Sequence, residues 1–247
     1  MCIADHSSLV NLLLFDDAEL AAPLARQDRR AQHVLDVLRR KPGDTFDVGR
    51  VDGPRGKATL VAIGSDALTL SFAWGLPPPP LEPIRLIIGL PRPQTARDIL
   101  RDATTLGVAE LHFVITGKGD VNYASSSLWH SGEARRHLLA GAAQAFDTRL
   151  PLLIHGESLT ATLAGVPAGG TRLALDNYEA AHSFGEFPSL VAPVTLAIGP
   201  ERGWSSTDRD HLRSAGFALA HLGPRVLRTE TAAIAAITLA RAKLGCS

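Results

Sequence analysis

Four consecutive prolines divide this chain into two parts, as an interdomain linker does. Pro77 to Pro80 have fixed φ angles and no backbone N–H groups, so they fit neither a helix interior nor the centre of a sheet. Such a run is typical of a stiff, extended linker. A chain of 247 residues is long enough for two domains, and we expect them at residues 1–76 and 82–247.

The part before the prolines predicts a small β-barrel with one short helix. Apolar and polar residues alternate in short segments, as in half-buried strands, and glycine- and proline-containing turns of the kind that joins strands lie between them. Apolar residues also recur at helical spacing between Arg30 and Arg40. The strands are expected at residues 45–48 and 67–72, and the turns at 41–44 and 52–56.

The part after the prolines predicts an α/β domain with a mainly parallel sheet, because strand-like and helix-like segments alternate along it. Its first strand is an almost unbroken apolar run, which is typical of a sheet covered on both faces. Strands are expected at 84–90, 111–116, 152–156, 171–175 and 194–198, and helices at 94–106, 133–146, 207–215 and 230–244, the last with Thr229 as its N-cap.

Composition narrows the classes of function. No apolar stretch reaches the length of a membrane span, and the N-terminus lacks the basic leader of a signal peptide, so we expect a cytoplasmic protein without membrane contact. The two cysteines, Cys2 and Cys246, lie at opposite ends of the chain, so neither a disulfide nor a metal cluster is expected.

The charge balance restricts how nucleic acid could bind. The net charge is zero and the pI is near 7.1, so any contact with nucleic acid must come from a local patch. The stretch from Arg26 to Lys57 contains nine basic residues and five acidic ones. This excess favours a nucleic-acid-binding patch and an ordinary solvated face equally. The RNA-binding candidates are Arg26, Arg29, Arg30, Arg39, Arg40 and Lys41.

Two glycine-bearing turns in the second part stand out as candidate ligand loops. Residues 198–204 (IGPERGW) follow an apolar strand directly, and residues 222–231 (LGPRVLRTET) precede the last helix. Glycine allows the backbone to approach a ligand closely because it has no Cβ. Loops that follow parallel strands open at the carboxyl edge of the sheet, where α/β proteins bind their ligands.

The order and spacing of these two turns resemble the SPOUT methyltransferases and, among them, the RsmE family, which methylates N3 of a uridine in small-subunit (16S) ribosomal RNA. Weaker similarities at residues 32–39, 42–44, 106–108 and 149–151 extend the resemblance over most of the chain. The resemblance implies a PUA-like β-barrel that grips RNA, followed by an α/β domain with a deep trefoil knot. It also implies a homodimer that acts on ribosomal RNA or the small ribosomal subunit.

The resemblance further implies that the knot holds S-adenosylmethionine, mainly through backbone groups. The cofactor residues are then Leu175, Ile198, Gly199, Pro200, Glu201, Gly203, Leu222, Gly223, Val226 and Leu227. The reaction needs removal of the weakly acidic N3 proton and alignment of N3 with the methyl group. Arg225 and Arg228 are candidates for holding the base or its phosphate, and Glu230 is a candidate for orienting an arginine. Alternatively, Glu230 only stabilises the helix N-terminus.

Several positions depart from the family pattern, which predicts a divergent member. Asp102 and Thr105 replace a lysine and a glutamate, and Gly117-Lys118-Gly119 replaces acid, arginine and serine. Further on, Phe146 and Asp147 replace glycine and arginine, and Arg202 replaces the second glycine of the cofactor turn. Acids in place of bases weaken the electrostatic attraction to RNA.

The departures keep two other classes of function open. One is an RNA-binding or ribosome-assembly protein that is weakly active or inactive in catalysis. The other is an enzyme that uses the same cofactor pocket on a different substrate. Cofactor binding that is irrelevant to RNA would indicate the first class, and a complete lack of RNA binding would indicate the second.

Overall fold

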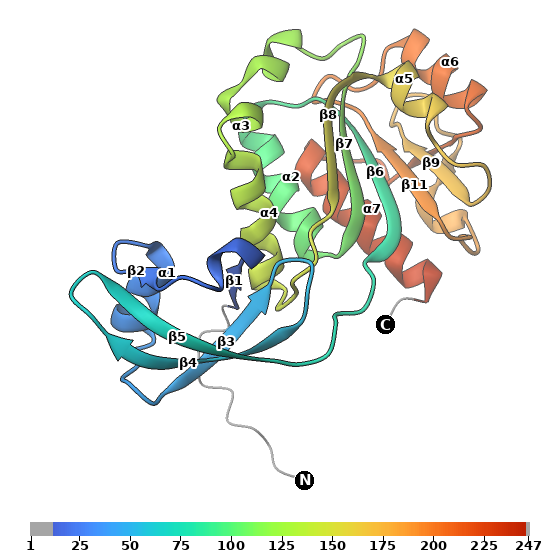
Figure 1. Cartoon of the computed structure of the whole chain (residues 1–247). Helices are drawn as coiled ribbons and strands as arrows, with labels where there is room; N and C mark the ends of the chain where they lie inside the picture. Colours follow the sequence, from blue (N-terminus) through green and yellow to red (C-terminus); the bar gives the residue numbers. More distant parts are fainter. Residues whose placement is uncertain (1–11, 246–247) are drawn as a thin grey trace. The chain divides into compact units, whose positions relative to one another are not determined.

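The computed structural model describes residues 12–245, which group into two compact units (Figure 1). The first unit contains the chain up to Pro80 together with residues 142–150, and the second contains the remaining residues. In the described part, no helix is long and apolar enough to cross a membrane, and no group of three or more His, Cys, Asp or Glu side chains could hold a metal ion.

A five-stranded sheet forms the first unit, with strand order β1-β3-β4-β5-β2. The strands are β1 (Leu13–Phe15), β2 (Leu24–Ala25), β3 (Thr45–Arg50), β4 (Arg55–Ile63) and β5 (Ala67–Trp74). β1 pairs with β3 in parallel, and the other pairs are antiparallel. Alternate residues such as Phe46, Val48 and Leu60 point into its apolar core. The expected strands at 45–48 and 67–72 are therefore present and extend slightly further.

The short helix expected before β3 is split into two forms. α1 (Arg29–Gln32) continues directly as a π-helical segment, η2 (His33–Val37). Asp28 caps α1, because its side chain accepts a hydrogen bond from the Arg30 N–H at 2.8 Å. The helix therefore ends three residues before the expected limit at Arg40.

Residues 142–150 join the first unit through the turn between β3 and β4. The carbonyl of Thr148 accepts a hydrogen bond from the Asp52 N–H at 2.8 Å, and its hydroxyl donates to the Gly53 carbonyl at 2.5 Å. Leu150 N–H donates to the Asp52 carboxylate at 2.9 Å. A segment that follows α4 (Glu133–Gln144) in the sequence thus belongs to the N-terminal unit by its contacts.

The second unit is built on a seven-stranded, fully parallel sheet with strand order β10-β12-β9-β11-β6-β7-β8. Its strands are β6 (Glu82–Gly89), β7 (Val108–Ile115), β8 (Leu152–Ser158), β9 (Thr171–Leu175), β10 (His182–Ser183), β11 (Val194–Ile198) and β12 (Ala218–His221). Ile198 stands level with Ile88 and Leu175 on the neighbouring strands, so three strands end at one edge. The expected α/β fold is confirmed.

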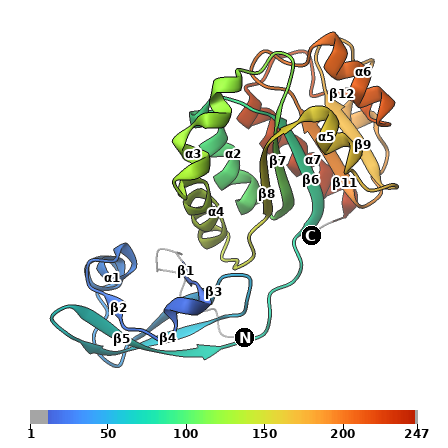
Figure 2. The same ribbon diagram turned by 45° about the horizontal axis from the view of Figure 1, so that its top comes forward.

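Helices cover both faces of this sheet (Figure 2). α7 (Thr229–Leu244) packs against α2 (Pro93–Thr105), β6 and β11. α5 (Leu159–Ala164) and α6 (Ser206–Ser214) contact each other on the face to which Ile87 of β6 points. The remaining helical segments are η1 (Asp17–Glu19), η3 (Val121–Ser125), α3 (Ser127–His130) and η4 (Phe184–Glu186).

Helix ends differ from expectation where capping decides them. α6 begins at Ser206 because the Ser205 hydroxyl accepts from the Asp208 N–H at 3.0 Å, while the Asp208 carboxylate accepts from the Ser205 N–H at 2.9 Å. The expected N-cap of the last helix is wrong, since Thr229 is its first residue and Arg228 is its N-cap. β12 and α5 were not predicted as separate elements.

Candidate functional site

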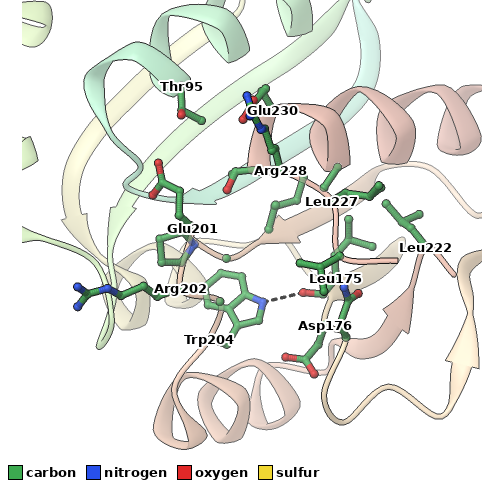
Figure 3. Close-up of a pocket in the computed structure, with 18 of the residues that line it drawn as sticks. Thr95, Leu175, Asp176, Glu201, Arg202, Trp204, Leu222, Leu227, Arg228 and Glu230 are labelled. Atoms are coloured by element: carbon green, nitrogen blue, oxygen red, sulfur yellow. Dashed lines mark hydrogen bonds between the residues drawn. The ribbon is translucent and has the colours of Figure 1, made fainter. Parts of the chain in front are cut away.

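A cavity of about 610 Å³ opens at the carboxyl edge of the parallel sheet, between the loops that follow β9, β11 and β12 (Figure 3). Its size is within the range of about 300–1,000 Å³ that is typical of small-molecule sites. The predicted residues that line it are Leu175, Ile198, Gly199, Pro200, Glu201, Gly203, Leu222, Val226, Leu227, Arg228 and Glu230. The structure thus brings together both glycine-bearing turns, although they are separated by α6 and β12.

Two predicted site residues are not among those that line the cavity: Gly223 and Arg225. Gly223 has a φ of +105°, a conformation that favours glycine whether or not a ligand is near. Its N–H donates to His221 Nδ1 at 3.1 Å. Arg225 is exposed to solvent. The glycine at this position is therefore explained by backbone geometry.

Close backbone contacts fix the loop after β11. The Gly203 N–H donates to the Pro200 carbonyl at 2.7 Å, and Gly203 has a φ of +68°. A Cβ on Gly199 would lie 3.0 Å from Gly203 Cα, and a Cβ on Gly89 would lie 2.3 Å from Pro200 Cδ. The loop can adopt this form only because the end of β6 also has no side chain at Gly89.

Trp204 forms part of the cavity wall and joins two of its loops. The residue is only 1% exposed, and its indole N–H donates to the Leu175 carbonyl at 2.9 Å, as Figure 3 shows. The ring packs in the same apolar cluster as Ala174, Ala197 and Leu212. Trp204 therefore stabilises the wall by packing and does not offer a ring face for a nucleobase.

A buried ion pair holds the loop after β9. The Asp176 carboxylate binds Arg209 Nε at 2.7 Å, and both side chains are buried. The other carboxylate oxygen accepts from the N–H groups of Tyr178 and Glu179 at 2.8 and 2.6 Å. Sequence reasoning missed Asp176, although an acid directly after an apolar strand at the expected edge is a usable signal.

Charged groups surround the opposite side of the cavity. Glu201 accepts a hydrogen bond from the backbone N–H of Arg92 at 3.0 Å, which ties the loop after β11 to the N-cap of α2. Arg92, Thr95 and Arg202 line the cavity and were not predicted as site residues. The cavity therefore combines an apolar wall with three arginines, counting Arg228, and with the carboxylates of its acidic residues.

The basic stretch of the first unit contains one arginine with a structural role. Arg30 binds Glu19 at 2.6 Å and Asp28 at 2.7 Å, and its guanidinium lies 4.6 Å from the centre of the Phe15 ring. Hydrogen bonds from Arg30 lower the pKa of both carboxyl groups, and those that Arg30 donates to Glu19 are the main cause that raises the pKa of Arg30. The exposed candidates are Arg26, Arg29, Arg39 and Lys41, while Arg40 is half-buried.

The two acids that replace basic residues of the family pattern both have local partners. Asp102 binds Arg101 Nε at 2.8 Å on the exposed side of α2. Asp147 accepts from the N–H groups of Thr148 and Arg149 at 2.6 and 3.1 Å. Asp147 thus stabilises the turn after α4, a role that its charge alone did not indicate.

The last helix is covered largely by elements of its own chain. Ile237 is fully buried, and α7 packs against α2 and two strands of its own chain. Ile234 remains 37% exposed. The apolar residues around this helix are therefore mostly covered by other elements of the same chain.

Comparison with known proteins gives a family match and full-length relatives. Residues 77–241 match the sequence model of the family described as "RNA methyltransferase domain". The chain is 33% identical to ribosomal RNA small subunit methyltransferase E of Treponema pallidum, over 92% of this chain and 89% of that protein. It is 23% identical to ribosomal RNA small subunit methyltransferase E 1 of Borreliella burgdorferi, over 95% of this chain and 99% of that protein. The chain also superimposes on a crystal structure of ribosomal RNA small subunit methyltransferase E from Neisseria gonorrhoeae bound to S-adenosylmethionine. The TM-score is 0.72 at 22% identity, and the match covers 94% of this chain and 98% of that one.

Proposed function

Since this chain belongs to the RsmE family of RNA methyltransferases, we propose that it transfers a methyl group from S-adenosylmethionine to N3 of a uridine in small-subunit ribosomal RNA. The observation that carries this proposal is the convergence of both glycine-bearing turns on one cavity of about 610 Å³ at the carboxyl edge of the sheet. The names of the relatives support ribosomal RNA as the substrate, and the N3 position rests on the family resemblance.

The volume of the cavity and the chemistry of its walls support this cofactor. Leu175, Ile198 and Leu227 offer apolar surface for an adenine ring. The absence of a Cβ at Gly199 and Gly203 lets a ligand reach backbone N–H and C=O groups for hydrogen bonding. The cationic sulfonium of the cofactor suits a site that also has carboxylates, and the bound cofactor supplies the methyl group.

The chain itself must orient the base. It must also accept the N3 proton or stabilise the anion that forms when this proton leaves. Arg228 and Glu230 line the cavity at the start of α7, and we propose that Arg228 holds the base or stabilises its developing negative charge. We propose that Glu230, which also lines the cavity, orients an arginine. Arg225 is exposed beside the cavity, where it is suited to an RNA phosphate rather than to the base.

We further propose that the second unit contains a trefoil knot. The strand order places β12 beyond β9, whereas α7 returns to pack against β11 and β6. Residues 222–228 must therefore run back past the loop that follows β11, and such a crossing is what a knot at this edge requires. The five-stranded first unit would be the PUA-like RNA-binding domain, with Arg26, Arg29, Arg39 and Lys41 facing RNA.

A homodimer is proposed from the family resemblance, with the exposed side of α7 near Ile234 at the interface. Light scattering tests it directly. A mass near twice 26.2 kDa is expected at micromolar concentration, and a monomer would contradict the proposal.

Two assays test the enzymatic proposal in order. Isothermal titration with S-adenosylmethionine should show one site per chain. Transfer of tritiated methyl groups should then occur to small ribosomal subunits from cells that lack this modification, and nuclease digestion should give N3-methyluridine. Cofactor binding without transfer would indicate a binding or assembly protein, and transfer only to other acceptors would indicate a different substrate.

A further inference from the structure

A second cavity, of about 350 Å³, adjoins the cofactor cavity and shares four of its residues. The shared residues are Arg92, Pro200, Glu201 and Arg202. The remaining wall comes from the loop after β7, which contributes Lys118, Gly119, Asp120, Val121 and Tyr123. In Figure 3 the side chain of Arg202 points away from Trp204 and Leu175 of the cofactor cavity. A ligand in this second space would be a direct neighbour of the bound cofactor.

The charges of the second cavity are arranged for an anion. Both of its carboxylates are engaged by backbone N–H groups: Asp120 accepts from Asn122 at 3.0 Å, and Glu201 accepts from Arg92 at 3.0 Å. In contrast, Arg92, Lys118 and Arg202 form no ion pair with any residue between 12 and 245. Lys118 contacts the Tyr178 ring, with its Nζ 5.9 Å from the ring centre. Within the described part of the chain, no carboxylate pairs with any of the three cations, which suits a phosphate group.

The loop that bears Lys118 is held firmly against the cofactor loop. The Gly117 N–H lies 3.2 Å from both carboxylate oxygens of Asp208, the acid that caps α6. A Cβ on Gly117 would lie 2.8 Å from the Ser205 hydroxyl, and one on Gly119 would lie 3.1 Å from the Thr116 hydroxyl. An acid at position 117, as in the family pattern, would face Asp208, so glycine here removes a negative charge and leaves Lys118 as the cation of this loop.

Tyr123 adds an aromatic ring to the same wall. The residue is half-buried, and its carbonyl accepts from the indole N–H of Trp129 at 2.9 Å, which fixes its backbone. Aromatic rings beside cations are the usual means of holding an unstacked nucleotide, because the ring stacks on the base and the cations bind the phosphate.

We propose that the second cavity binds the target nucleotide of the RNA, with Lys118 and Arg202 holding its phosphate and Tyr123 stacking on its base. The inference rests on the proposed function, since it places the methyl acceptor beside the cofactor. It also assigns a role to Lys118, which stands where the family pattern has arginine, and to Arg202, which stands where it has glycine.

The experiment compares binding of small-subunit ribosomal RNA at several salt concentrations. The double variant Lys118→Gln/Arg202→Gln should lose about 10-fold in affinity, and its salt dependence should be shallower by about two phosphate contacts. Tyr123→Leu should also lose about 10-fold, whereas Tyr123→Phe, which keeps the ring, should match the wild type. Arg136→Gln on α4 removes one exposed positive charge elsewhere and should change affinity less than 2-fold. Titration with S-adenosylmethionine should give the wild-type Kd for both Tyr123 variants and for Arg136→Gln, because neither residue lines the cofactor cavity.

Unchanged RNA affinity and salt dependence in the double variant would overturn the inference. A fall in cofactor affinity as large as the fall in RNA affinity in Tyr123→Leu would also overturn it, because Tyr123 lines only the second cavity, which would then be part of the cofactor site. Failure of the proposed function is distinguishable: wild-type protein that binds RNA through Lys118, Arg202 and Tyr123 but transfers no methyl group would disprove methylation and leave the nucleotide site in place.

Discussion

The carboxyl edge of the parallel sheet, our proposed cofactor edge, is stabilised by one kind of contact. The N-terminal sheet is stabilised by another kind. At the cofactor edge, Gly89, Gly199 and Gly203 allow backbones to meet at distances that a Cβ would not permit. In the N-terminal sheet, the β1 and α1 regions are joined by Arg30 with Glu19 and Asp28. The spacing of glycines along the sequence indicates where backbones can pack closely. The partner of a charged side chain comes from elsewhere in the chain, so the sequence does not indicate it.

The difference explains why sequence patterns predicted backbone geometry better than they predicted the pairing of charges. The spacing of the glycine-bearing turns predicted a set of residues that share one cavity. The basic stretch predicted an RNA surface, but Arg30 lies between two carboxylates and has little charge to offer a phosphate. A charge count over a stretch of sequence cannot separate such an arginine from its exposed neighbours.

The largest expected effect on ligand binding comes from breaking the backbone fit at the cofactor edge. Gly89→Ala would place a Cβ 2.3 Å from Pro200 Cδ and 2.6 Å from Pro200 N, so the loop after β11 must move. We expect a loss of affinity for S-adenosylmethionine of at least about 100-fold, comparable to the loss of about 2.7 kcal/mol of binding free energy. Gly185→Ala is the matched control, because its Cβ would meet only the Ser183 hydroxyl at 3.5 Å. Calorimetry with unchanged affinity in Gly89→Ala would show that the loop is not held by this contact.

The next effect tests whether charge also matters at the cofactor edge. Asp176→Asn keeps an acceptor for the N–H groups of Tyr178 and Glu179 but leaves Arg209 as a buried charge whose remaining ionic partner is the Glu179 carboxylate at 3.4 Å. Breaking one side of a buried ion pair typically costs about 3–5 kcal/mol of unfolding free energy. Urea denaturation should show a loss in that range, and the double variant Asp176→Asn/Arg209→Met should recover part of it. A single variant within 1 kcal/mol of the wild type would mean that Arg209 finds water or Glu179 instead.

The third prediction concerns the pH dependence of the N-terminal sheet. Hydrogen bonds from Arg30 lower the folded-state pKa of Glu19 below 4.5 and that of Asp28 below 3.8. A lowered folded pKa gives stability that is present above the unfolded pKa values and is lost as the pH falls through the folded ones. Stability should therefore decline in acid below about pH 4.5, and Arg30→Met should flatten this decline. Thermal unfolding between pH 7 and pH 3 measures it, and parallel profiles for both proteins would contradict the prediction.

Much of the fold followed from the sequence, and the exceptions have physical causes. The strands at 171–175 and 194–198 have the predicted limits, because their apolar runs end at polar or glycine residues. β12 was not predicted as a strand because a four-residue segment is too short to show a period. Asp176 and Lys118 were missed as site residues because their importance depends on Arg209 and Arg202, which only the folded chain brings near.

The smallest effect is expected at Phe146, where the family pattern has glycine. Phe146 has a φ of +55°, and the N–H groups of Phe146 and Asp147 donate to the carbonyls of Ala143 and Ala142 as α4 ends. A non-glycine residue in this conformation costs about 1–2 kcal/mol.

The cost at Phe146 is offset by a neighbour from β4. The guanidinium of Arg55 lies 5.4 Å from the ring centre and donates to the Phe146 carbonyl at 3.0 Å. A cation–π contact at such an exposed position contributes about 0.5–1 kcal/mol. Relief of strain and loss of this contact therefore nearly cancel in Phe146→Gly, and we expect a change of less than about 1 kcal/mol in unfolding free energy. Phe146→Val keeps the backbone strain, which its β-branch increases, and removes the ring that contacts Arg55. It should therefore lose about 1–3 kcal/mol of unfolding free energy. Urea denaturation of the two variants decides the matter: a large gain in Phe146→Gly would show that the ring contact with Arg55 contributes nothing, and a neutral Phe146→Val would show that this turn carries no strain.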